Sequence, residues 1–135
     1  GARVAEEAPT ITHGAIPYGA GYVAATAAGA GVIVDPRASA SPSIRELFAR
    51  HPHIGPVLPA VGYDREQLDA LRETIDRAGV DVVVAASPLD LGALIDLRTR
   101  VVRARYEFVD AGWPTLASMV DGFLARSLER RLGAR

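Results

Sequence analysis

A glycine-rich segment near the amino terminus carries the strongest chemical signal in the sequence. It reads Gly14-Ala-Ile-Pro-Tyr-Gly-Ala-Gly21, the spacing of a phosphate-binding P-loop up to the lysine position, where this chain has Ala20. Backbone amides of such a loop, and of the helix start behind it, can hold an anion. Without the lysine and the hydroxyl residue of a P-loop, they cannot hold Mg²⁺ or polarise a γ-phosphate.

The same glycines allow two other interpretations. Gly19-Ala-Gly21-Tyr-Val-Ala24 fits the dinucleotide pattern G-x-G-x-x-A, and Asp35 follows at the end of the next expected strand, at a shorter spacing than usual. Alternatively, the small residues only let a helix pack closely against a sheet. The sequence leaves ligand contact and packing equally open.

Several side chains near the expected strand ends could contact a ligand. His13 could bond a phosphate or act as an acid or base, and the tyrosines beside the loop could stack on a ligand or pack. Asp35 and Arg37 could bind a polar ligand or form a local ion pair, and Arg103 and Arg105 could share an anion or a neighbouring carboxylate. The candidate ligand-binding residues are Thr12, His13, Gly14, Tyr18, Gly19, Gly21, Tyr22, Asp35, Arg37, Arg103 and Arg105.

Composition excludes several kinds of chemistry. The chain has no cysteine, and all fifteen basic residues are arginine, so thiolate, Cys-type zinc and lysine Schiff-base chemistry are excluded. His51 and His53 are two residues apart without an obvious third ligand, so we expect no metal site. A net charge of −1 argues against nucleic acid and membrane as partners. No apolar run is long enough for a membrane helix and no signal peptide is visible, so a cytoplasmic location is expected.

Strand-like and helix-like segments alternate along the 135 residues. This alternation predicts an α/β fold with a mainly parallel sheet and helices on both faces, a Rossmann-like three-layer arrangement. We expect residues 1–125 to form a single α/β domain and residues 126–135 a charged, frayed tail. The expected strands are a weak one around residues 3–5 and others at 32–34, 57–58, 80–86 and 101–109, and the expected helices begin near residues 22, 41, 64, 88 and 114.

Four segments together resemble one known family. They are Ile11-Thr-His-Gly-Ala-Ile-Pro-Tyr-Gly-Ala-Gly-Tyr22, Ile33-Val-Asp-Pro-Arg37, His51-Pro-His-Ile-Gly-Pro-Val-Leu-Pro-Ala-Val-Gly-Tyr63 and Val101-Val-Arg-Ala-Arg-Tyr-Glu107. In this order they resemble the C-terminal part of the cyclic 2,3-diphosphoglycerate synthetase family, which is described as P-loop GTPase-like. The likeness covers nearly the whole chain.

The resemblance implies a function that composition does not show. Family members are longer and carry their P-loop upstream of the matching region, and the named enzymes use ATP to close 2,3-diphosphoglycerate into a cyclic diphosphate. It implies that this chain is the C-terminal domain of a nucleotide-dependent ligase. The domain would bind a phosphorylated small molecule opposite an upstream P-loop domain. No cofactor is expected in this chain, and ATP or GTP with Mg²⁺ only in the full-length protein.

Two other functions remain open. The chain could be a non-catalytic interaction or homodimerisation module, which would use the apolar stripe of the last helix from Leu116 to Leu124. It could also be a small dinucleotide-binding domain that uses Gly19, Gly21 and Asp35.

Overall fold

The computed structural model describes residues 1–9, 18–60 and 64–133. The chain divides into two compact units, Gly1–Arg105 and Tyr106–Arg135. The boundary falls inside the region that was expected to form a single domain over residues 1–125. Each unit is therefore described by itself.

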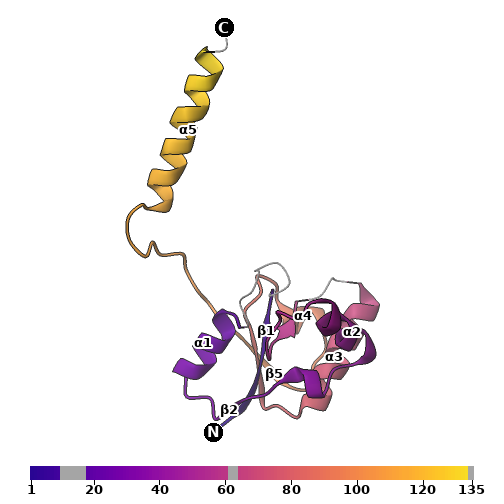
Figure 1. Ribbon diagram of the computed structural model, residues 1–135. Helices are drawn as coiled ribbons and strands as arrows, with labels where there is room; N and C mark the ends of the chain where they lie inside the picture. Colours follow the sequence, from indigo (N-terminus) through magenta and orange to yellow (C-terminus); the bar gives the residue numbers. More distant parts are fainter. Residues whose placement is uncertain (10–17, 61–63, 134–135) are drawn as a thin grey trace. The chain divides into compact units, whose positions relative to one another are not determined.

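The first unit is built on a five-stranded parallel sheet (Figure 1). β1 lies at its centre, with β4 on one side and both β2 and β3 on the other. β2 pairs with the amino half of β1 and β3 with its carboxyl half, and β5 extends the sheet beyond β4. The strands are β1 (Arg3–Ala8), β2 (Val32–Ile33), β3 (Leu58–Pro59), β4 (Val82–Ala85) and β5 (Arg100–Arg103).

Local sequence signals explain where the longest helix of this unit begins and ends. Asp64 Oδ1 accepts a 2.9 Å hydrogen bond from the Gln67 amide and so caps the first turn of α3. Gly79 ends α3 in the left-handed conformation, with φ of 59°, which favours glycine. The helices of the first unit are α1 (Ala20–Ala27), the 3₁₀ helix η1 (Pro36–Ala38), α2 (Pro42–Arg50), α3 (Arg65–Ala78) and α4 (Leu91–Leu94).

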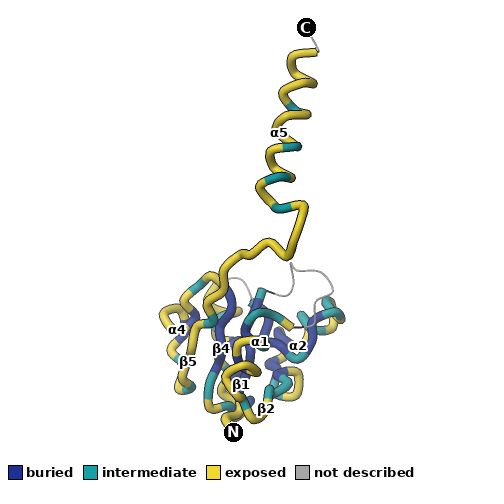
Figure 2. The backbone as a smooth tube through the Cα atoms, turned by 90° about the vertical axis from the view of Figure 1, so that its left-hand side faces the viewer, coloured by how far each residue is buried: buried dark blue, intermediate teal, exposed yellow. Residues whose placement is uncertain are grey.

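Alternate residues of the central strands pack on opposite faces of the sheet. Ala5 and Val83 belong to a cluster with Ile75 of α3, which also contains Ile44 of α2 and Leu91 of α4. Val4 and Val84 pack with Ala25 of α1 on the other face. The arrangement has helices on both faces of a parallel sheet and confirms the expected α/β, Rossmann-like fold class. Figure 2 shows the burial of the central strands.

Two strands differ from the sequence prediction. β1 continues through Glu6 and Glu7 to Ala8, whereas the sequence showed only a weak strand signal around residues 3–5. β5 ends at Arg103, whereas the alternating pattern predicted a strand as far as Val109. The expected β-like stretch at residues 10–12 lies outside the described residues.

The second unit contains one long helix, α5 (Leu116–Gly133), preceded by a segment without regular secondary structure. Residues 126–133, which were expected to belong to a frayed tail, continue this helix. No residue of α5 is buried, and its large apolar side chains are all more than two-fifths exposed. Among the described residues, no helix is long and apolar enough to cross a membrane.

Candidate functional site

The strand order reverses between β1 and β4. The chain goes from β1 to β2 and β3 on one side of the central strand, and then crosses to β4 and β5 on the other side. In parallel α/β sheets, ligands bind in the crevice outside the carboxyl ends of the two strands at such a reversal. Here these ends are Ala8 and Ala85. The residues around them therefore form the candidate site.

The first turn of α1 is bound by a side chain from β1. The backbone amide of Gly19 donates a 2.8 Å hydrogen bond to Oε1 of Glu6, thirteen residues earlier in the chain. Gly19 has no side chain that could cap the helix, so the Glu6 carboxyl group takes that position. In this structure the amide of Gly19, one of those that the sequence suggested could hold an anion, binds the carboxyl group of Glu6.

Both glycines at the start of α1 are required by this close approach. A Cβ atom at Gly19 would lie 2.7 Å from Cβ of Ala8 and 2.8 Å from Oε1 of Glu6. A Cβ atom at Gly21 would lie 2.9 Å from Cγ of Glu6 and 3.2 Å from the carbonyl oxygen of Val84. The glycines therefore allow α1 to pack against the sheet, one of the two roles that the sequence left open.

Glu6 is the least satisfied polar side chain of the site. It is 1% exposed, and among the described residues its Oε2 atom has no hydrogen-bond partner. Burial raises the pKa of Glu6, while the amides of Tyr22, Gly19 and Gly21 act in the opposite direction. The group thus combines a desolvated carboxyl oxygen with a set of amides that favour its charged form.

Glu7 lies on the other face of the sheet and is bound by the segment that follows β4. The Ser87 hydroxyl donates a 2.9 Å hydrogen bond to Oε2 of Glu7, and both residues are buried. Burial raises the pKa of Glu7; Ser87 lowers it, and the neighbouring Glu6 charge raises it. Glu7 and Ser87 therefore connect the two strands at which the strand order reverses.

The sequence analysis did not identify Glu6 or Glu7. Two adjacent acids are usually solvent-exposed, and the strand signal was assigned only around residues 3–5. The available signal was their position between the apolar pair Val4-Ala5 and Ala8, directly before the glycine-rich segment. A central parallel strand is covered on both faces, and any acid within it is buried.

Several predicted site residues contact one another. The rings of Tyr18 and Tyr22 lie 5.0 Å apart, centroid to centroid. Oδ1 of Asp35 accepts a 3.0 Å hydrogen bond from the Arg37 amide and a 2.8 Å bond from its Nε, which makes a local ion pair at the start of η1. This hydrogen bond lowers the pKa of Asp35 and raises the pKa of Arg37.

The predicted arginines Arg103 and Arg105 do not join either pair. Arg103 ends β5, and its guanidinium donates to the carbonyl oxygen of Pro88. Arg105 lies beyond the end of β5, so the two arginines do not share a strand face. Thr12, His13 and Gly14 lie outside the described residues. The described part of the chain holds no group of three or more His, Asp or Glu side chains that could bind a metal.

Comparison with known proteins adds one relative. The chain is 45% identical over 118 residues to a protein named arginine synthetase ArcE from Thermococcus kodakarensis. The alignment covers 87% of this chain and 26% of the relative, so the chain spans about a quarter of that protein's length. No family model and no solved structure matches the chain. The likeness relates the chain to a synthetase.

Proposed function

We propose that this chain is the substrate-binding domain of a nucleotide-dependent ligase similar to arginine synthetase. The observation that carries the proposal is the 45% identity over 87% of the chain. The motif resemblance to cyclic 2,3-diphosphoglycerate synthetases supports this class, because that resemblance implies a nucleotide-dependent ligase. The crevice between β1 and β4 is the part of the fold that would bind the substrate.

The nucleotide would be bound outside this chain. The sequence has no lysine to contact the β- and γ-phosphates, and Ala20 occupies the P-loop lysine position. ATP or GTP with Mg²⁺ would therefore bind to a separate P-loop domain of the full-length protein, as in the family that the sequence resembles. The domain described here would hold the group to be activated opposite that nucleotide.

The named relative and the motif resemblance suggest two different substrates, and the charged groups near the carboxyl end of β1 favour one of them. The name of the relative points to arginine, and the motif resemblance to 2,3-diphosphoglycerate. Glu6 and Glu7 lie at the carboxyl end of β1, and their carboxyl groups attract a guanidinium and repel a polyanion. The amides at the start of α1 face Glu6. We therefore propose arginine, or the precursor that is converted to it, as the ligand.

Calorimetric titration of the chain with L-arginine and with 2,3-diphosphoglycerate tests this choice. A guanidinium near the carboxyl end of β1 would lower the raised pKa values of Glu6 and Glu7, so arginine binding should release protons. A polyanion there would raise the pKa values further and take protons up. Titrations in two buffers with different ionisation enthalpies measure the sign of the proton transfer directly.

The Glu7→Gln variant is the matched control, since its side chain cannot ionise. It should bind arginine more weakly and with less proton release. Binding of 2,3-diphosphoglycerate with proton uptake would instead favour the phosphorylated substrate. The absence of heat with either ligand at millimolar concentration would contradict a substrate-binding role for this chain.

One observation favours a second function, that of an interaction module. α5 carries a row of exposed apolar side chains at helical spacing: Leu116, Met119, Val120, Phe123, Leu124, Leu128 and Leu132. A stripe of this width is normally covered by another helix or by a second protein surface. Light scattering after size exclusion should detect a dimer that Leu124→Glu converts to a monomer. A monomeric wild-type chain would contradict homodimerisation.

A further inference from the structure

A cavity of about 350 Å³ lies apart from the crevice, near the amino end of β1. Arg3, which begins β1, lines this cavity, whereas the crevice follows Ala8 at the other end of the strand. A rise of about 3.3 Å per residue separates these ends by about 17 Å. The remaining wall comes from the segment after β2, from α2 and from the end of α3, and includes Asp35, Ser39, Arg45 and Arg77. The cavity is therefore distinct from the proposed substrate site.

Three guanidinium groups line this cavity, and two of them are held by neutral groups. Nε of Arg3 donates a 3.0 Å hydrogen bond to the carbonyl oxygen of Gly79. Nη2 of Arg45 donates a 3.1 Å bond to the carbonyl oxygen of Ala40. Within the described part of the chain, neither guanidinium has a carboxylate at ion-pair distance. One hydrogen bond orients each guanidinium group without neutralising its charge.

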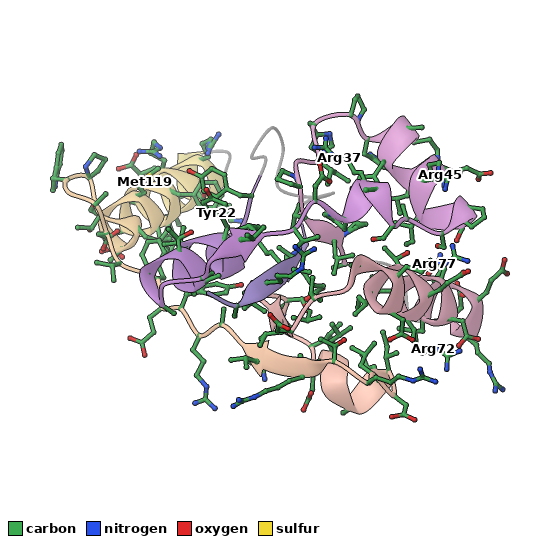
Figure 3. The ribbon with its side chains drawn as sticks, turned by 90° about the horizontal axis from the view of Figure 1, so that it is seen from below. Tyr22, Arg37, Arg45, Arg72, Arg77 and Met119 are labelled. Carbon is green, nitrogen blue, oxygen red and sulfur yellow. The ribbon has the colours of Figure 1, made fainter. Side chains whose placement is uncertain are left out.

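The acids near the cavity do not compensate these two arginines. Asp35 lines the wall, but both of its carboxylate oxygens accept hydrogen bonds from Arg37. The third lining arginine, Arg77, forms an ion pair with Glu73 one turn earlier in α3. Figure 3 shows Arg45 and Arg77 on the neighbouring helices α2 and α3. The cavity therefore carries an excess of positive charge.

We propose that this cavity binds the phosphate group of a phosphorylated small molecule. Guanidinium groups donate paired N–H bonds that match the oxygens of a phosphate, and they bind such groups better than a lysine does. A volume of about 350 Å³ falls within the range of small-molecule sites and leaves room for an organic part beside the phosphate. The site is independent of the ligand proposed for the crevice.

Calorimetry with glycerol 3-phosphate and with inorganic phosphate, at constant ionic strength, tests the proposal. Glycerol 3-phosphate should bind saturably and more tightly than inorganic phosphate. Arg45→Gln and Arg3→Gln should each weaken binding by about tenfold, as expected for the loss of one charge-assisted interaction. Arg45→Lys should recover part of the affinity, because it keeps the charge and loses the paired donors.

Arg72→Gln is the matched control. Arg72 also lies on α3 in an ion pair, with Asp69, and it does not line the cavity. Its substitution should leave the affinity unchanged. An equal loss in Arg72→Gln and Arg45→Gln would show general attraction by surface charge and overturn the site. If inorganic phosphate binds as tightly as glycerol 3-phosphate, the cavity does not recognise the organic part of a ligand, and this part of the proposal is wrong. Circular dichroism checks that each variant is folded. Arg45→Gln should still bind arginine as the wild type does, so a failure of the phosphate site can be told apart from a failure of the proposed function.

Discussion

Oε1 of Glu6 accepts a 2.8 Å hydrogen bond from the backbone amide of Gly19, so a strand residue caps the first turn of α1. A cap normally comes from the residue that precedes the helix. Here the acid comes from the sheet against which the helix packs. The hydrogen bond therefore ties the start of α1 directly to β1. This hydrogen bond requires α1 to lie close to β1, which is possible only because positions 19 and 21 are glycine.

Gly19→Ala should destabilise the fold by about 1–3 kcal/mol, because the new methyl group would overlap with Ala8 and with the Glu6 carboxyl group. Urea denaturation followed by circular dichroism measures the change in unfolding free energy. Gly92→Ala is the matched control, since a Cβ atom there would lie no closer than 3.6 Å to its neighbours. Equal stabilities of the two variants would contradict the close packing at Gly19.

Ser87→Ala should destabilise the chain by about 1–3 kcal/mol at neutral pH, since it leaves Oε2 of the buried Glu7 without its hydroxyl donor. The loss should shrink in acid, where a protonated Glu7 depends less on that donor. Thermal denaturation at the two pH values measures both effects. Ser43→Ala, on the exposed side of α2, should change stability little. A loss that is the same at both pH values would contradict the role of Ser87 as a donor to the carboxylate.

Glu7→Gln should raise the free energy of unfolding, relative to that of the wild type, more at neutral pH than in acid. Burial raises the pKa of Glu7 above its ordinary value of 4.5. The folded chain therefore holds the proton more tightly than the unfolded chain. The contribution of Glu7 to stability is fully present below pH 4.5 and is lost as the pH rises through the raised pKa. A glutamine side chain does not ionise, so the Glu7→Gln variant does not lose this stability as the pH rises.

Unfolding free energies of the wild type and Glu7→Gln, measured between about pH 4 and pH 8, check the sign of this effect. The difference between the two proteins should grow in favour of the variant with increasing pH. Glu66→Gln, exposed in the first turn of α3, is the control for a change of surface charge. A difference that runs in the opposite direction would show that the folded state prefers the ionised form of Glu7.

Asp64→Ala should destabilise the chain by about 0.5–2 kcal/mol, because the amide of Gln67 loses its acceptor at the start of α3. Chemical denaturation measures this change. Asp76→Ala removes the same charge from an exposed position of the same helix and should stay within about 0.5 kcal/mol of the wild type. Equal losses in both variants would assign the effect to charge and not to capping.

The elements that the sequence predicts best are those with local boundaries. Asp64 and Gly79 define α3 within a few residues, and the run Val82-Val83-Val84 predicts β4, because caps and short apolar runs act through neighbouring residues. The β5 prediction was too long. Alternation beyond Arg103 has the spacing of a strand, but the sheet offers no partner strand to the described residues there.

The candidate site was only partly predictable. The sequence identified the glycine-rich segment and the strand ends, since these follow from the α/β pattern. It could not show that Glu6 faces the amides of Gly19 and Gly21, because that contact depends on how α1 packs on β1. The arginine-lined cavity was also missed. Arg3, Arg45 and Arg77 are far apart in the sequence and are brought together only by the fold.

Glu6 and Glu7 are consecutive residues of one strand, so their side chains leave the sheet in opposite directions while their charges remain close. A ligand that removes the charge of Glu6 would also ease the ionisation of Glu7 on the far side. The sheet would then pass a change of protonation from one helical layer to the other without any movement of its backbone.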